Sequence, residues 1–409
     1  MGMQLTIAGA GGMPAPRERV DAILAGREAS FEGVYVHVPF CFHKCHYCDF
    51  YSFVDREDRQ EPFVARAEAE VRALAPFVRA PLRTLFVGGG TPTLLRVPLL
   101  ARLLGSLRAS LPWDAGAEWT VEANPETVTA EVAGALAAAG VGRVSLGAQS
   151  FDPRHLKTLE RWHDPESVAR AVGLLRAAGI GRISVDLIFG IPGQSAGDWE
   201  RDLRAAVALG TDHLSCYGLT YEPNTAMTAR MERGEFEPCD DDAEARMLER
   251  ADALLGEAGF ARYEVSNWAR VRGGDARAEE CRHNLLYWED RDWLAVGPSA
   301  SGHASGVRWK NVPRLGDWLA GEGASDAVDV ERGSPDVRAG ERLMMGLRLV
   351  RGLPEAEVDA ALALGAGGPR RRAAIDRAVA EGRMERCGGF VRFTPRGMMI
   401  ANAVLAELV

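Results

Sequence analysis

The 409-residue sequence has few cysteines, very little lysine and no long apolar run. A disulfide scaffold is normally short and spreads its cysteines along the chain, whereas the seven cysteines here are unevenly placed. The longest run of small apolar residues, 132–141, contains two glycines and is far shorter than the roughly 20 residues that a membrane-spanning helix needs. These absences exclude a disulfide-rich secreted domain and a membrane-embedded protein.

Lysine occurs only at Lys44, Lys157 and Lys310, so arginine supplies nearly all of the positive charge. The 57 acidic residues outnumber the 48 basic ones, and the net charge of −9 argues against a general nucleic-acid binder. Residues 1–13 are glycine-rich and have neither the basic start nor the apolar centre of a secretory signal. We therefore expect a cytoplasmic protein with reduced thiols and no transmembrane segment, and peripheral membrane contact stays open.

Between residues 31 and 220 a short β-branched run is followed by an alanine- and leucine-rich helical stretch about six times. Alternating strands and helices require a parallel sheet covered by helices, so the predicted fold class is α/β. Six units are too few for a complete eightfold barrel and predict a partial (β/α)6 barrel, with a doubly wound sheet as the main alternative. The predicted strands are Val34–Val38, Thr84–Val87, Trp119–Glu122, Arg143–Leu146, Arg182–Leu187 and His213–Tyr217.

The regular alternation stops after Glu222. Residues 321–340, rich in Gly, Ser and Asp, predict a linker, and a helix over 371–381 precedes a hairpin over 386–395 that turns at Gly388-Gly389. This order is typical of a winged helix, which either binds DNA or packs against other domains, and packing is favoured here. We predict an N-terminal tail (1–30), the partial barrel (31–230), a linking region (231–325) and a smaller α+β C-terminal region ending in a winged-helix-like module (326–409).

Three of the cysteines, Cys41, Cys45 and Cys48, fall within eight residues with the spacing C-x3-C-x2-C. A structural zinc site usually takes four ligands from paired C-x2-C units, and no second pair is present. Three thiolates on one loop are able to hold three irons of a four-iron cluster and leave the fourth iron open. Zinc bound with help from His43 or His46 is the alternative.

Polar residues follow successive predicted strands at the same end. The cysteine loop follows the first strand, and 88–93 (Gly-Gly-Gly-Thr-Pro-Thr) follows the second, where glycines let the backbone approach a ligand closely. Glu122 ends the third strand, Gln149 follows the fourth, and Asp186 lies at the end of the fifth. Ligand sites of parallel barrels gather at the carboxyl ends of the strands. We therefore expect these residues to form one binding site at this end of the sheet, which we call the mouth.

The cysteine spacing after one strand and the glycine loop after the next resemble the radical S-adenosylmethionine (SAM) superfamily. The chain more closely resembles the oxygen-independent coproporphyrinogen III oxidase group, in segments 35–41, 122–125, 147–151, 161–163 and 186–194. The resemblance implies a radical SAM barrel in which Cys41, Cys45 and Cys48 hold a [4Fe-4S] cluster and S-adenosyl-L-methionine binds the open iron. It also implies SAM contacts from Tyr35, Tyr47, Gly89, Gly90, Thr91, Glu122, Gln149, Arg161 and Asp186.

One departure from the oxidase pattern matters. The oxidase carries another cysteine two positions after the third cluster ligand, where this chain has Phe50, and its segment before the cysteine loop is longer. These differences favour a resemblance to the related HemW family of heme chaperones, in which SAM either regulates the state or assembly of the cluster or feeds a radical reaction. A true oxidase, which uses a 5′-deoxyadenosyl radical in the decarboxylation of coproporphyrinogen III, is the alternative function.

The hallmark of those chaperones, His-Asn-x-x-Tyr-Trp, occurs here at residues 283–288, in the linking region. The resemblance implies that His283 binds heme iron, which histidine commonly ligates. If the segment is helical, Tyr287 lies one turn along on the same face, and Cys281 is a rival ligand. The implied partners are heme, acceptor hemoproteins of the respiratory chain and an electron donor such as flavodoxin or ferredoxin, with no nucleic acid.

Overall fold

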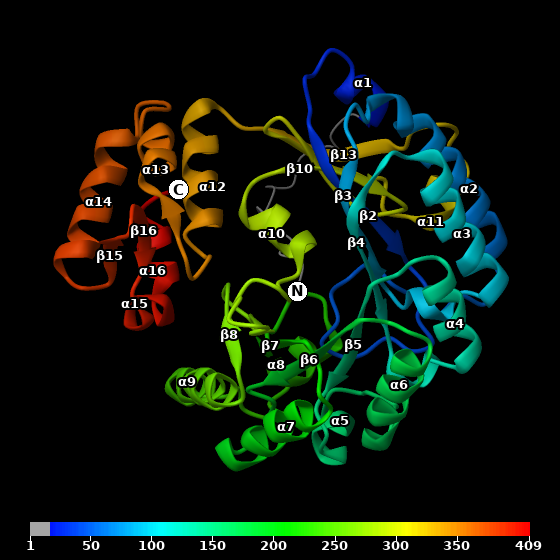
Figure 1. The fold of residues 1–409 in the computed structure, drawn as a ribbon, viewed down its shortest axis with the longest axis horizontal. Helices are drawn as coiled ribbons and strands as arrows, with labels where there is room; N and C mark the ends of the chain where they lie inside the picture. The colour runs from blue at the N-terminus through cyan, green and yellow to red at the C-terminus, as the bar shows by residue number, and fades with distance from the viewer. Residues whose placement is uncertain (1–16) are drawn as a thin grey trace.

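The computed structural model describes residues 17–409 (Figure 1). Six parallel strands form the centre of the large sheet in the order in which they occur in the chain, and each contains or overlaps a predicted strand. The predicted parallel α/β core is therefore confirmed. These strands are β2 (Phe31–Val38), β3 (Leu82–Gly89), β4 (Trp113–Ala123), β5 (Arg143–Gln149), β6 (Arg182–Phe189) and β7 (His213–Gly218).

Helices connect these strands and cover the outer, convex side of the sheet, which curves into an arc (Figure 1). Their leucines, valines and alanines pack on the buried face of the strands in one continuous core. The connecting helices are α2 (Gln60–Leu74), α3 (Val97–Ser110), α4 (Ala130–Ala138), α5 (Pro153–Thr158), α6 (Pro165–Ala177) and α7 (Ala196–Ala208).

Within residues 17–409 the sheet has 13 strands, more than the six predicted. β10 (Asp292–Val296) pairs parallel with β2, and four antiparallel strands continue that edge. The additional strands are β11 (Ser301–Ala304), β12 (Val307–Asn311), β13 (Asp326–Arg332) and β1 (Glu18–Arg19) on that edge, with β9 (Asn267–Arg270) and β8 (Phe260–Arg262) beyond β7.

Two sequence expectations need correction in this part of the chain. The linker predicted at 321–340 is wrong, because β13 pairs on both sides, with β12 and with β1, and β-sheet pairing outweighs the loop-like composition of the segment. The predicted region 231–325 contributes strands to the large sheet and also holds α9 (Asp241–Glu257), α10 (Arg282–Trp288) and α11 (Leu315–Leu319). The helix α8 (Ala226–Glu232) crosses the predicted boundary between residues 230 and 231. Of the predicted N-terminal tail, residues 1–16 lie outside the described residues, and Val20–Leu24 forms α1.

The C-terminal module has its own apolar core and a three-stranded sheet. Its hairpin turns at Gly388 and Gly389, whose φ angles of 61° and 80° suit a two-residue turn that only glycine-like residues adopt readily. Helices followed by this hairpin match the predicted winged-helix-like arrangement. The elements are α12 (Pro335–Gly346), β14 (Leu353–Pro354), α13 (Glu355–Leu362), α14 (Gly368–Ala380), β15 (Met384–Cys387), β16 (Phe390–Phe393), α15 (Pro395–Met399) and α16 (Ala401–Leu405).

Six of the eight arginines in residues 370–396 pair with acids of the same module. Arg371 is buried and pairs with Asp336 at 2.9 Å, and Arg386 pairs with Asp376 at 2.8 Å. The same pattern holds for Arg372, Arg377, Arg383 and Arg392, each of which pairs with a carboxylate. This compensation fits a packing role better than a phosphate-binding surface. Separately, no helix within residues 17–409 has the length and apolar character needed to cross a membrane.

Candidate functional site

The cysteine loop leaves the carboxyl end of β2 and is closed at its base. The N–H of Cys41 donates to the carbonyl of Phe53 at 3.0 Å, and the N–H of Phe53 donates to the carbonyl of Pro39 at 3.0 Å. Cys41, Cys45 and Cys48 are free thiols, each half-buried. The loop is therefore held in place while its thiols stay within reach of a ligand at the mouth of the arc.

Polar side chains contact two of these thiols. The Thr91 hydroxyl lies 3.8 Å from Cys41 Sγ, and Nη1 of Arg161 lies 3.5 Å from Cys45 Sγ. Burial raises the pKa of the Cys48 thiol to about 11 and also raises that of Cys41. Because iron binds the thiolate, we expect loading of this loop to release protons.

Asn124 joins the two thiol contacts. Its amide nitrogen donates to the Thr91 hydroxyl at 3.0 Å, and its amide oxygen accepts from Nη2 of Arg161 at 2.9 Å. A continuous hydrogen-bonded path thus runs from Cys41 through Thr91, Asn124 and Arg161 to Cys45. The Nε atom of Arg161 is buried and has no hydrogen-bond partner among the described residues, which leaves one donor for a further acceptor.

The glycine loop passes close to the strand that precedes the cysteines. Gly89 has a φ of 103°, and a Cβ at this position would lie 2.4 Å from the His37 ring. A Cβ on Gly90 would lie 2.6 Å from the carbonyl oxygen of Phe40. Only glycine fits at these two positions, so the close backbone approach predicted for this loop is present, made to β2 and the start of the cysteine loop.

His37 connects the predicted residue Tyr35 to the end of the cysteine loop. Its Nε2 donates to the Tyr51 carbonyl at 2.8 Å, so the Tyr35 hydroxyl donates to Nδ1 at 3.0 Å. Burial lowers the pKa of His37 to about 4, which keeps the ring neutral at pH 7. Sequence reasoning missed His37 and Asn124 as site residues, although each lies two positions from a predicted one at the carboxyl end of its strand.

Two carboxyl groups lie on the inner face of the mouth. Glu122 accepts the N–H of Gly89 at 3.0 Å, and Asp186 accepts the Ser145 hydroxyl at 3.1 Å. Burial, followed by the neighbouring charge of Asp186, raises the pKa of Glu122 to about 7, and burial also raises that of Asp186. This pair suits a ligand that brings an ammonium group or several hydrogen-bond donors.

The remaining predicted contacts also lie at this mouth. Gln149 has a φ of 65°, and its amide nitrogen lies 2.9 Å from where a Cβ on Gly147 would stand. Arg161 Nη2 donates to the Gly147 carbonyl. Burial, followed by the nearby Cys45, raises the pKa of Tyr47, and the Arg161 charge opposes this shift. The structure thus brings the predicted cysteines and the predicted SAM contacts together at one end of the sheet.

His283 lies elsewhere, on α10, which packs against the amino-terminal halves of the strands. Its Nδ1 is 2.8 Å from the Thr84 hydroxyl, its Nε2 is 2.9 Å from the Tyr287 hydroxyl, and its ring stacks on Phe86. The residue is 1% exposed, and burial lowers its pKa to about 3. Tyr287 is on the same helical face, as expected, but both imidazole nitrogens that could meet iron are already engaged.

A buried ion pair holds the start of α10. Arg143 and Glu118 are buried and lie 3.0 Å apart, and Glu118 also accepts the N–H of Arg282 at 2.8 Å. Cys281, the rival ligand, is buried beside this pair, and burial raises its thiol pKa to about 12. Cys281 is not part of the His-Asn-x-x-Tyr-Trp motif, so His283 is the better of the two candidates.

One further group of ligand-type side chains occurs at Asp152, His155 and Asp198, whose ligand atoms lie within 4.8 Å of one another. Arg154 already pairs with both carboxylates, at 2.6 and 3.1 Å. The arginine supplies the positive charge that a metal ion would bring, so this group links α5 to α7 through ion pairs.

Comparison with known proteins adds family information to this geometry. The family model of the radical SAM superfamily matches residues 35–206, and that of the HemN C-terminal domain matches 334–400. The chain is 39% identical over 384 residues to the heme chaperone HemW of Mycobacterium tuberculosis (strain ATCC 25618 / H37Rv), covering 92% of this chain and 94% of that protein. It is 34% identical over 379 residues to the heme chaperone HemW of Escherichia coli (strain K12), covering 91% and 96%.

Among solved structures, the fold is similar to that of coproporphyrinogen III oxidase (HemN) from Escherichia coli. The TM-score is 0.80 over 95% of this chain and 93% of that chain, at 21% sequence identity. At this identity the likeness concerns the fold, including both the arc and the C-terminal module.

Proposed function

This chain belongs to the HemW family within the radical SAM superfamily, and we propose from that membership and from its two sites that it is a heme chaperone. It binds heme and a SAM-ligated [4Fe-4S] cluster and delivers heme to hemoproteins of the respiratory chain. The observation that carries the proposal is the coexistence of a preformed three-thiol loop with a complete His-Asn-x-x-Tyr-Trp helix in one chain.

The residues at the mouth fit the cluster and its cofactor. Cys41, Cys45 and Cys48 hold three irons, and when bound the cluster supplies an electron and an open iron site for SAM. Arg161 has a planar guanidinium and one buried donor without a partner, which suits the carboxylate of SAM. Glu122 and Asp186 suit its ammonium and ribose hydroxyls, and Gly89 and Gly90 let the backbone pass closely.

At the other end, His283 is the proposed heme ligand. Its neutral ring has the lone pair that iron requires, and Tyr287 orients it. An electron donor such as flavodoxin or ferredoxin would reduce the cluster. Transfer to respiratory hemoproteins takes place in the cytoplasm, with peripheral contact to the membrane that holds them.

Phe50 separates this proposal from the oxidase alternative. It stands where the oxidase has an additional cysteine beside the cluster ligands, and a phenylalanine offers neither a ligand nor a proton donor there. Similarity of fold to HemN does not decide between the two, because one fold hosts different functions.

Heme titration of the purified chain and of His283→Ala, followed by the Soret absorbance band, tests the proposal. We expect saturable binding of about one heme by the unaltered chain and at least a tenfold weaker affinity in the variant, because an iron ligand is lost. His303→Ala, which removes another buried histidine from the same region, serves as the matched control. Turnover of coproporphyrinogen III with SAM and reductant would instead establish the oxidase.

A further inference from the structure

Two aromatic side chains lie exposed on the surface beside the cysteine loop. Phe42 is 59% exposed and Trp162 is 61% exposed, and among the residues that the structure describes they are the only exposed Phe, Tyr or Trp side chains. Their rings meet edge to face, with centroids 5.7 Å apart, and the His43 ring stacks on Trp162 at 4.3 Å. Phe42, His43 and Trp162 thus form one continuous surface, which we call the aromatic patch.

The aromatic patch adjoins two of the proposed cluster ligands. Phe42 directly follows Cys41 in the chain. Trp162 directly follows Arg161, whose Nη1 lies 3.5 Å from Cys45 Sγ. A protein that contacts the aromatic patch from outside is therefore separated from these thiols by only one or two residues.

Hydrogen bonds fix the two segments that carry the patch. The N–H of His46 donates to the carbonyl of Leu159 at 3.4 Å, and the N–H of Met227 donates to the carbonyl of His46 at 2.8 Å. Nη1 of Arg230 donates to the carbonyl of Thr158 at 3.1 Å and lies 3.2 Å from Nδ1 of His46. The cysteine loop and the end of α5 are therefore both tied to α8. A partner meets a preformed surface, which lowers the entropy cost of docking.

A hollow of about 740 Å³ continues the patch over α5 and the start of α6. Its lining includes the apolar side chains of Phe151 and Leu156 as well as Trp162. Single exposed apolar residues are common on protein surfaces, whereas a contiguous apolar patch marks an interaction site. Tryptophan is also among the residues that contribute most to binding at protein interfaces. The patch and its hollow therefore suit a protein partner.

Two lysines provide positive charge around the patch. Lys157 lines the hollow, is exposed, and has no ion-pair partner among the described residues. Lys44 lies two residues after Phe42 and donates to the carbonyls of Phe50 and Ser52, at 3.2 and 3.3 Å, rather than to a carboxylate. Both lysine charges are therefore available to a partner.

The acids that line the hollow are already engaged. Glu160 accepts the indole N–H of Trp162 at 3.4 Å. Asp164 pairs with Arg170 at 3.1 Å. Glu166 lies in the first turn of α6, where the helix N–H groups offset part of a negative charge. The two lysines thus favour a partner with an acidic surface, because opposite charges guide association.

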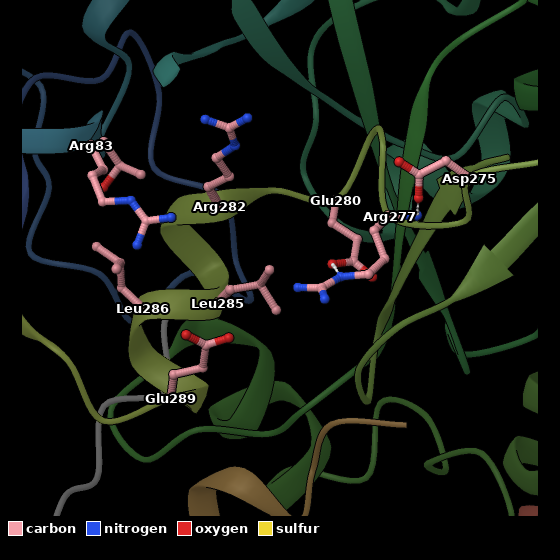
Figure 2. A pocket seen from close by; sticks show the side chains of 9 residues that line it. Arg83, Asp275, Arg277, Glu280, Arg282, Leu285, Leu286 and Glu289 are labelled. Carbon is pink, nitrogen blue, oxygen red and sulfur yellow. Dashed lines mark hydrogen bonds and ion pairs between the residues drawn. The ribbon is translucent and has the colours of Figure 1, made fainter. Parts of the chain in front are cut away.

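The pocket beside α10 has a different character (Figure 2). It measures about 440 Å³, and its lining is mostly charged and contains no aromatic residue. Arg277 and Glu280 of this lining pair with each other at 3.4 Å. Arg282 is exposed, and its guanidinium donates to the carbonyl of Gly116 at 3.1 Å. This pocket lies at the amino ends of the strands, so Arg282 offers a control cation away from the patch.

We propose that the aromatic patch is the docking site of the electron donor, a small acidic protein that carries a flavin or an iron–sulfur centre. This inference rests on the proposed function and names the surface through which the cysteine loop receives its electron. The reduced donor loses one electron and the cluster gains it, so no bond forms or breaks. An apolar centre with a charged rim suits the small, short-lived interfaces of redox partners.

The test compares reduction of the reconstituted cluster by a protein donor and by dithionite, a small reductant that needs no docking site. Reduced flavodoxin and reduced ferredoxin are the two protein probes. We expect Phe42→Ala and Trp162→Ala each to slow reduction by the protein donor about tenfold below saturation, the loss typical of an aromatic residue at the centre of an interface. Reduction by dithionite should change less than twofold. Ile400→Ala removes an exposed apolar side chain of the C-terminal module and is the matched control.

Binding of the oxidised donor gives a second readout that does not depend on electron transfer. Calorimetric titration should show about tenfold weaker affinity in Phe42→Ala and Trp162→Ala. Lys157→Ala should weaken binding about threefold at low ionic strength and less than twofold in about 1 M salt, because salt screens the charge. Arg282→Ala removes an exposed cation at the other end of the strands and should change neither value.

Unchanged reduction by the protein donor in both aromatic variants would overturn the inference. Slower reduction by dithionite in these variants would also overturn it, since the cluster itself would then be disturbed, as would failure of both donors to reduce the unaltered chain. If Trp162→Ala converted a dimer into a monomer in sedimentation, the patch would join two copies of the chain and the inference would be wrong. A chain that takes up no iron, or shows no Soret change with heme, would instead contradict the proposed function itself.

Discussion

The two ends of the strand arc are built in opposite ways. At the carboxyl end, three half-buried thiols face a mouth lined by Glu122 and Arg161, and Arg161 keeps one donor without a partner. At the amino end, His283 is 1% exposed, with both ring nitrogens hydrogen-bonded and a buried ion pair nearby. The carboxyl end, which we call the open end, is arranged to receive a ligand. The amino end, which we call the closed end, buries the histidine that is its candidate iron ligand.

This difference teaches that the same predicted role, binding iron, has different structural requirements at the two ends. A cluster site needs thiols held ready on a fixed loop, because the cluster remains bound. A heme carrier must also release its heme, and a histidine that returns to internal partners after release favours that step. The following variants test this contrast, beginning with the largest expected effect.

Removing the Glu118 carboxylate from the closed end should strongly lower the free energy of unfolding. Glu118→Ala leaves the charge of Arg143 buried without its partner, and we expect a loss of about 3–5 kcal/mol in the free energy of unfolding, measured with urea. Replacement of both residues by methionine should recover most of this loss, since no buried charge then remains. A loss below about 1 kcal/mol in the single variant would show that this end is not rigidly closed.

The stability of the fold should depend on pH through the carboxyl group of Glu122 at the open end. Its folded-state pKa of about 7 is above the ordinary value of 4.5, so the stability that its protonated form contributes is present below pH 4.5 and is lost as pH rises through 7. Glu122→Gln should therefore stabilise the fold by about 2 kcal/mol at pH 8 and have little effect at pH 4.5. Thermal melting across this pH range measures the effect, with exposed Glu131→Gln as the control, and equal shifts at both pH values would contradict it.

The sequence predicted the open end far better than the closed one. Cys41, Glu122 and Asp186 lie at or near the carboxyl ends of β2, β4 and β6, so a repeating pattern and the rule for parallel sheets were enough to place them together. The closed end depends on pairs far apart in the chain, such as Thr84 with His283, which no local pattern encodes. The hallmark identified His283, but no sequence pattern predicted its burial, because that burial results from the packing of α10 on the strands.

The same reasoning explains the errors in the outer sheet. The strand character of β10 and β13 depends on neighbouring strands that come from distant parts of the sequence. The composition of 321–340 resembles a loop, and only the strands on either side of β13 make it a strand. Conversely, the turn at Gly388 and Gly389 is a local signal, and the hairpin was predicted correctly.

The smallest expected effect concerns Asn124, which joins Thr91 and Arg161 at the open end. Asn124→Ala removes both hydrogen bonds but no cluster ligand, so the iron content after anaerobic reconstitution should stay near that of the unaltered chain. The Arg161 charge beside Cys45 would be held less firmly, and a positive charge near the cluster favours its reduced form. We therefore expect the reduction potential, measured by electron paramagnetic resonance titration, to fall by on the order of tens of millivolts. Asn124→Gln, which retains the amide group, should restore part of the shift, whereas loss of iron in the alanine variant would mean that the mouth is less preorganised than its geometry indicates.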